Sequence, residues 1–211
     1  MRRPTAIVIF IFPVCLAPVV AAEPDILIAD FEGDTYGDWK VTGEAFGPGP
    51  ARGTLPGQMA VSGFEGRGLV NTFFKGDGTT GTLTSPEFKI ERDWINVLIG
   101  GGAHKDKTCI NLLVDGEVVR TAVGPNAVPG GSEALDWESW DVAELGGKQA
   151  VIQIVDEATG GWGHVNIDQI VQAERKMAFE TIAREMKVDK ALLHLPVKTG
   201  ARKRLLRLVV D

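Results

Sequence analysis

Residues 108–122 read Thr-Cys-Ile-Asn-Leu-Leu-Val-Asp-Gly-Glu-Val-Val-Arg-Thr-Ala, two apolar runs joined by Asp-Gly at positions 115–116. Asp-Gly between two such runs is a strong signal for a two-residue hairpin, because the favoured turn needs positive φ at both positions. Successive side chains of a strand point to opposite faces, so Leu112 and Val114 share one face and Leu113 lies on the other. The stretch therefore predicts an antiparallel pair with one face toward a core.

The same alternation of short apolar runs and Gly-rich turns recurs from residue 25 to residue 171. The spacing of these runs, and the absence of a helical period, predict an all-β sandwich. Val, Ile, Thr, Trp and Phe fill the runs, as expected for strands. We predict strands at 26–31, 39–42, 68–74, 81–84, 88–90, 95–100, 108–114, 117–122, 137–141, 150–156 and 164–171.

Three consecutive glycines, Gly100 to Gly102, end one predicted strand. No Gly-Lys-Ser/Thr follows them and no helix is expected after them, so they do not form a phosphate-binding loop. Glycine at a strand end is typical of a bulge or of a close approach by another backbone segment. We predict one of these two structures here.

The first 22 residues have the pattern of a secretory signal peptide. Arg2 and Arg3 precede an apolar run at 6–20, and small residues up to Ala22 offer a cleavage site. The run is short for a bilayer span, so we expect no stable membrane insertion after cleavage. The mature chain is expected to be secreted or periplasmic, starting near residue 23.

The end of the chain changes character. Residues 174–190 contain good helix formers with Met177 and Met186 roughly on one side, which predicts a helical linker. Residues 191–211 then read as the first, incomplete hairpin of a second β-domain. We expect domain boundaries at 1–22, 23–173, 174–190 and 191–211, with the second β-domain truncated at Asp211.

Charge and cysteine content exclude some functions. Residues 23–173 carry 23 acidic and 10 basic side chains, a balance of −13, whereas residues 174–211 carry 5 acidic and 10 basic, a balance of +5. An acidic domain is a poor nucleic-acid binder, because phosphate contacts need clustered Lys and Arg. Cys109 is the one cysteine after residue 22, so it cannot form an internal disulfide there, and we expect a buried, unreactive side chain.

Several longer phrases carry a family resemblance. They include Gly-Pro-Gly-Pro-Ala-Arg-Gly-Thr-Leu-Pro-Gly-Gln at 47–58, Trp-Glu-Ser-Trp-Asp-Val at 137–142 and the last strand with its Gly-Trp-Gly-His turn. From residue 28 to about residue 173 the chain resembles the N-terminal accessory region of bacterial levanase-like and exo-inulinase-like fructan hydrolases of glycoside hydrolase family 32. The resemblance implies a jelly-roll, galactose-binding-like sandwich that binds a fructan polysaccharide or supports an adjoining catalytic domain.

The catalytic motifs of that family are absent from this chain. The family's Trp-Met-Asn-Asp-Pro-Asn-Gly, Arg-Asp-Pro and Glu-Cys motifs do not occur, and Trp94-Ile-Asn-Val is the nearest fragment. Retaining hydrolysis needs two carboxyl groups about 5–5.5 Å apart, and no pair in the sequence is a candidate. We expect no catalysis by this chain alone. Two alternatives stay open: a fragment of a fructan hydrolase that carries its parent's activity elsewhere, and a purely structural packing module.

Aromatic side chains are the candidates for sugar binding, because their faces stack on the apolar faces of sugars. Trp162 is the first choice, since it lies between two glycines and beside His164, which is also a candidate. Trp39 and Trp140 follow. Trp137 and Trp140 are three residues apart, so on a regular strand one of them is expected in the core.

A structural calcium ion is the one cofactor that the sequence suggests. Glu32, Asp34 and Asp168 flank the first and last strands, which are expected to pair, and carboxylate oxygens suit Ca²⁺. The alternative is that Asp34 and the nearby Asp38 cap turns. His104 and His164 lie 60 residues apart without the ligand spacing of a zinc site, so no transition metal is expected.

Overall fold

The computed structural model describes residues 23–178. The predicted signal peptide, the linker from residue 179 onward and the predicted hairpin at 191–211 lie outside the described residues. The one described helix, the 3₁₀ turn η1 (Ala143–Leu145), is far too short to cross a membrane. The strands are β1 (Ile26–Ala29), β2 (Lys40–Gly43), β3 (Val70–Asn71), β4 (Gly81–Thr84), β5 (Phe88–Lys89), β6 (Trp94–Gly101), β7 (Thr108–Val114), β8 (Glu117–Ala122), β9 (Asp136–Asp141), β10 (Gln149–Asp156) and β11 (Val165–Ala173).

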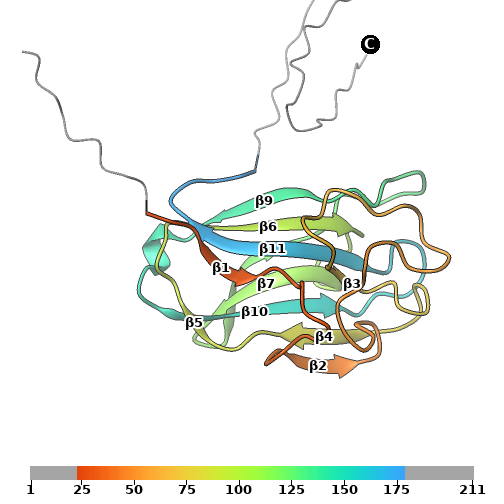
Figure 1. Cartoon of the computed structure of the whole chain (residues 1–211), viewed down its shortest axis with the longest axis horizontal. Helices are drawn as coiled ribbons and strands as arrows, with labels where there is room; N and C mark the ends of the chain where they lie inside the picture. Colours follow the sequence, from red (N-terminus) through yellow and green to blue (C-terminus); the bar gives the residue numbers. More distant parts are fainter. Residues whose placement is uncertain (1–22, 179–211) are drawn as a thin grey trace, which may run out of the picture. The chain divides into compact units, whose positions relative to one another are not determined.

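The strands form two antiparallel sheets packed as a jelly-roll sandwich, so the predicted all-β fold is confirmed (Figure 1). The first sheet has the order β1-β11-β6-β9, with β3 also pairing with β11. The second has the order β2-β4-β10-β7-β8, with β5 also pairing with β10. The first and last strands, β1 and β11, are direct neighbours, as expected.

The main core lies between the sheets. Ile152 and Ile154 of β10 meet Val97 of β6 and Ile167 of β11, and all four are fully buried. A second, smaller cluster covers the other face of the first sheet, where loops pack over Leu98 and Trp137. Both faces of the first sheet are therefore covered, which is why polar residues of β11 are also buried.

The 108–122 hairpin forms as predicted. Asp115 and Gly116 have φ of 54° and 81°, the positive values that a two-residue turn of this kind needs. Leu112 and Val114 face the core with 0% and 3% exposure. Cys109 is buried and free, and burial raises the pKa of its thiol to about 11, so it is unreactive as expected.

Two predicted segments differ from the structure. The strand expected at 68–74 is confined to Val70–Asn71, because the Asn71 side chain accepts a hydrogen bond from the Phe73 amide (3.1 Å) and turns the chain out of the sheet. Residues 174–178, the described part of the expected helical linker, are not helical. Their amides bond to side chains instead: the Met177 N–H donates to Asn96 Oδ1 (2.9 Å) and the Ala178 N–H donates to Ser139 Oγ (2.8 Å).

Candidate functional site

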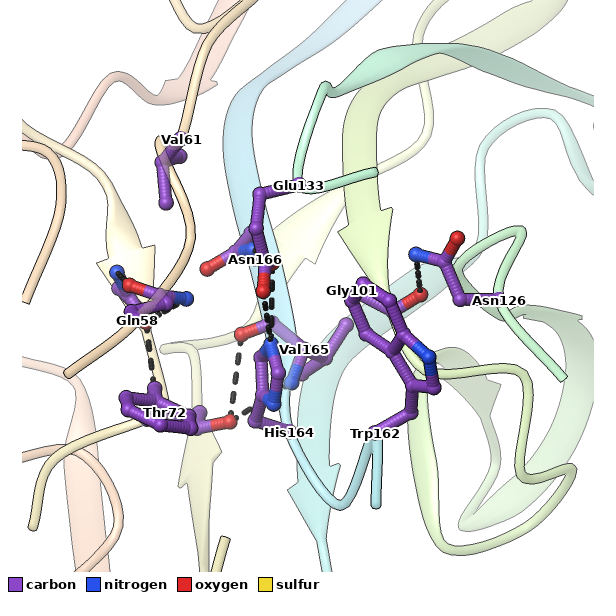
Figure 2. Close-up of polar contacts among 12 residues, drawn as sticks. Gln58, Val61, Thr72, Gly101, Asn126, Glu133, Trp162, His164, Val165 and Asn166 are labelled. Atoms are coloured by element: carbon purple, nitrogen blue, oxygen red, sulfur yellow. Dashed lines mark hydrogen bonds and ion pairs between the residues drawn. The ribbon is translucent and has the colours of Figure 1, made fainter. Parts of the chain in front are cut away.

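A buried histidine lies at the start of β11, at one end of the sandwich. His164 is 2% exposed, and each ring nitrogen faces a carboxylate. Nδ1 lies 2.6 Å from Asp77 Oδ1. Nε2 lies 3.0 Å from Glu133 Oε2, the contact drawn in Figure 2. Asn166 donates from Nδ2 to the same Glu133 oxygen (2.8 Å). Four polar side chains from three segments thus form one cluster.

The two carboxyl groups favour the charged form of the imidazole. Burial alone would lower the pKa of His164, but the hydrogen bonds and charges of Glu133 and Asp77 outweigh it and hold the pKa above the usual value. Glu133 is itself only 3% exposed, so it is enclosed with these partners away from water. The cluster is one imidazole between two carboxyl groups, of which Glu133 is buried and Asp77 is partly exposed.

Asp156 is a further buried carboxyl group at this end of the molecule. It ends β10, is 0% exposed, and neither of its carboxylate oxygens has a hydrogen bond of good geometry. Burial raises its pKa to about 7, and the nearby Thr72 hydroxyl and His164 charge pull the pKa down less strongly. Near neutral pH this group therefore sits close to its titration midpoint.

Trp162 covers the cluster rather than standing free in the loop. Its indole lies 5.6 Å from the His164 ring at 31°, and its Nε1–H donates to the Val128 carbonyl (3.1 Å). The side chain is half-buried, and φ is 60°, an uncommon conformation for a tryptophan. Of the four residues predicted to bind sugar, Trp162 and His164 contact each other, and His164 has no exposed surface to offer a ligand.

Trp140 is a core residue. It is 4% exposed and belongs to the main cluster between the sheets. Trp137, three residues earlier on β9, lies in the cluster on the opposite face of the first sheet. Side chains three residues apart on a strand point to opposite faces, so this is the expected arrangement. Both rings are buried because both faces of this sheet are covered, and this burial removes Trp140 from the candidates for ligand contact.

Trp39 lines a groove on the surface. A groove of about 450 Å³ runs between β1 with its following loop and the connection from β4 to β5. Trp39 is half-buried there, with its ring edge-on to Phe31 at 5.4 Å. The aromatic lining consists of Phe31, Tyr36, Trp39 and Phe88, and the polar lining includes Asp30, Asp38, Ser85, Glu87 and Gln172.

The three predicted calcium ligands divide into two groups. Asp168 is 0% exposed, and the charges of Glu32 and Glu65 act on it; burial first, and then these charges, raise its pKa to about 7. Asp168 Oδ2 accepts the Glu65 amide (2.8 Å), whereas its Oδ1 has no partner. Asp34 is not part of this group, because its carboxylate is fully exposed and pairs with Arg52 (2.9 Å).

The Asp168 group offers oxygen atoms but not a complete set of metal ligands. Within residues 23–178, no three His, Cys, Asp or Glu side chains are arranged to hold a metal ion. However, Gln169 is the residue after Asp168, and its Oε1 is a second buried oxygen without a hydrogen-bond partner. Gln169, which follows Asp168, has a positive φ of 44°. Phe31, which precedes Glu32, has a positive φ of 52°. An all-oxygen set of this kind fits a hard cation such as Ca²⁺.

The sequence did not single out Asp77, Glu133 or Asp156. For Asp156 a signal was present, because Ile152 and Ile154 face the core and the alternation places position 156 on the same face. Asp77 and Glu133 lie in loops, where no periodicity tells which way a side chain points. Their meeting with His164 depends on the paths of two loops that sequence spacing does not determine.

Comparison with known proteins finds a curated relative. The chain is 47% identical over 148 residues to the "Putative glycosyl hydrolase ecdE" of Aspergillus rugulosus. The match covers 69% of this chain but 20% of that protein, so the chain spans about a fifth of its relative. No protein-family model matches the chain.

Solved structures with a similar fold are distant in sequence. A family 35 carbohydrate-binding module from Clostridium thermocellum is 12% identical, with 71% of this chain and 97% of that chain covered and a TM-score of 0.36. A cyclase from Fischerella sp. TAU is 16% identical, with 72% and 95% covered and a TM-score of 0.45. The K1 cleaved adhesin domain of Lys-gingipain from Porphyromonas gingivalis is 15% identical, with 72% and 99% covered and a TM-score of 0.43.

Proposed function

We propose that residues 23–173 form an exported, non-catalytic module that binds an uncharged glycan in the groove beside β1. The observation that carries this proposal is the half-buried Trp39 ring at a groove of about 450 Å³ that also presents carboxylates and a hydroxyl. A ring face or edge contacts the apolar side of a sugar, and the oxygens accept hydrogen bonds from its hydroxyl groups.

The lining argues against an acidic ligand. Asp30, Asp38 and Glu87 line the groove, and no Lys, Arg or His does. The whole 23–173 segment has a balance of −13, so uronic or sulfated sugars would be repelled. Neutral fructans, levan and inulin, are the first glycans to test, because the sequence resembles the accessory region of family 32 hydrolases. The similarity to one stretch of the Aspergillus rugulosus protein supports a link to a glycoside hydrolase.

Replacing Trp39 by alanine tests the groove. We expect binding to levan or inulin to weaken about tenfold, because an aromatic contact of this kind contributes ~1 kcal/mol or more and about 1.4 kcal/mol is a factor of ten. Isothermal titration or affinity electrophoresis measures this. Trp94→Ala is the matched control, since Trp94 is also half-buried but does not line the groove. Equal losses in both variants, or none in Trp39→Ala, would contradict the proposal.

Support of an adjoining catalytic domain is the second candidate role. Asn96 and Ser139 hold the amides of Met177 and Ala178, and Asn96 Nδ2 donates to the Arg175 carbonyl (3.1 Å). The chain that leaves the module is therefore held against the first sheet at residues 175–178. If the full chain binds no neutral glycan, this role becomes the favoured one.

A calcium ion held by Glu32, Asp168 and neighbouring oxygens is the further part of the proposal. Bound there, the ion would give partners to the buried oxygens of Asp168 and Gln169. We expect millimolar Ca²⁺ to raise the melting temperature of the full chain by several degrees over a chelator-treated sample, as binding to the folded state alone requires. Asp168→Asn should abolish this shift, while Asp34→Asn should keep it. An equal shift with Mg²⁺, or none with Ca²⁺, would argue against the site.

A further inference from the structure

Three connections at one end of the sandwich meet on a single imidazole ring. Asp77 belongs to the connection between β3 and β4, Glu133 to that between β8 and β9, and His164 ends that between β10 and β11. The contacts are direct, 2.6 Å from Nδ1 to Asp77 and 3.0 Å from Nε2 to Glu133. One side chain thus contacts all three connections, of which those carrying Asp77 and His164 are also linked by a backbone hydrogen bond from Gly160 to the Asp77 carbonyl (3.1 Å).

This geometry depends on one proton. A carboxylate only accepts hydrogen bonds, and a neutral imidazole has one N–H to donate, so only the imidazolium form of His164 can donate to both Asp77 and Glu133. Glu133 also accepts from Asn166 Nδ2 (2.8 Å), at the same oxygen that lies 3.0 Å from His164 Nε2. If His164 loses its proton, the lone pair of one ring nitrogen faces a carboxylate oxygen.

We propose that His164, Asp77 and Glu133 form a proton-operated latch that holds segment 127–133 and the Trp162 ring in place. With the proton present, the latch is closed, and Figure 2 shows its contact between His164 and Glu133. Without the proton, the ring can donate to one carboxylate only. In the tautomer that keeps the Asp77 contact, Glu133 is a buried carboxylate facing a lone pair, and it leaves for water. The segment that carries Glu133 moves with it, and Trp162 loses the Val128 carbonyl that its indole N–H binds.

The released part is limited to this segment because the rest of the module is held by other contacts. Among the described residues, neither hydrophobic cluster includes a member from 123–134, and Val128 is 69% exposed. Residue Asn126, just before the segment, stays tied through its backbone and side chain to the Gly101 carbonyl (3.2 and 2.8 Å). The sheets keep their core, so the opening is local.

Every ionisable group near the His164 ring is acidic, so each one, when ionised, favours the protonated ring. Asp77 and Glu133 contact it, and Asp156 of β10 acts on it through space. The remaining neighbours are uncharged: the Phe73 ring lies edge-on at 5.0 Å, and Trp162 covers the other side. Nothing among these neighbours provides a positive charge that could replace the proton.

Hydrogen exchange of the full chain as a function of pH tests the latch. Protection factors, corrected for the intrinsic exchange rate, would be followed from about pH 5 to about pH 10 together with the His164 ring resonance. We expect peptides from 127–133 to lose at least tenfold protection as the His164 ring titrates, while β7 and β10 keep theirs. His104→Gln, a change at another histidine, should leave this profile unchanged.

Two variants separate a latch from a merely structural contact. His164→Gln should expose segment 127–133 at every pH, with no remaining transition. If that variant does not fold, Glu133→Gln still decides the question. It removes one negative partner, so the His164 midpoint should shift to lower pH by about one unit or more; because the new amide can donate to the deprotonated ring, segment 127–133 should no longer lose protection as His164 titrates. In the unsubstituted chain, protection that stays constant through the His164 titration, or that falls in β7 and β10 simultaneously, would overturn the proposal.

Discussion

Replacing Gly102 by alanine should destabilise the module by about 3 kcal/mol or more, because overpacking against a backbone atom cannot relax by a rotamer change. A Cβ at this position would lie 1.9 Å from the Trp162 carbonyl oxygen. The glycine cannot move aside easily, since its N–H donates to the His164 carbonyl (2.8 Å) and its own carbonyl accepts from Gly124 (2.9 Å). Two loops are therefore fixed against the end of β6.

Urea denaturation of the full chain measures this effect, with Gly78→Ala as the matched control. A methyl group at Gly78 would meet no atom within 4 Å, and the residue has no positive φ, so alanine there should change the free energy of unfolding by less than about 1 kcal/mol. Similar stability of the Gly102 and Gly78 variants would mean that the close approach at the end of β6 is relaxed in solution.

A bulge or a close backbone approach was predicted for the three glycines at 100–102, and the structure has a close approach at Gly102; the strands around it were also predicted. All eleven expected strands occur in the expected order, because strand periodicity and turn residues are local signals. The Asp-Gly hairpin formed with Leu112 and Val114 inward for the same reason. The sequence alone predicted which way a side chain faces wherever the alternation along a strand is the one factor that decides it.

The candidate sites were less predictable because they depend on loop paths. Trp162 lies in a glycine-rich loop, which suggested an exposed ring. Segment 127–133 lies over it instead, and the Val128 carbonyl accepts a hydrogen bond from its indole N–H. His164 was selected for its position beside Trp162, whereas its actual partners, Asp77 and Glu133, are 87 and 31 residues away in the chain. Trp39 was selected as an aromatic, and only the structure gives it a groove.

Asp156→Asn should remove much of the alkaline sensitivity of the folded module. Burial raises the pKa of Asp156 from 3.8 to about 7, so the folded state binds this proton more tightly than the unfolded state does. The stabilisation is complete below the unfolded pKa and is lost as pH rises toward the folded pKa. Between about pH 5 and about pH 8 this single group should reduce the free energy of unfolding by roughly 3 kcal/mol, at about 1.4 kcal/mol per pKa unit.

The asparagine variant keeps the shape of the side chain and has no proton to lose. It should therefore be less stable than, or equal to, the parent chain at about pH 5, and more stable at about pH 8, so the two stability curves cross. His164 acts in the same direction, because its raised pKa means that its contribution is lost as pH rises through the folded value, and the variant retains that part of the slope. Urea midpoints at a series of pH values measure the difference. Parallel curves for the two proteins would show that Asp156 ionises in the folded state without cost, which requires a partner for its two carboxylate oxygens.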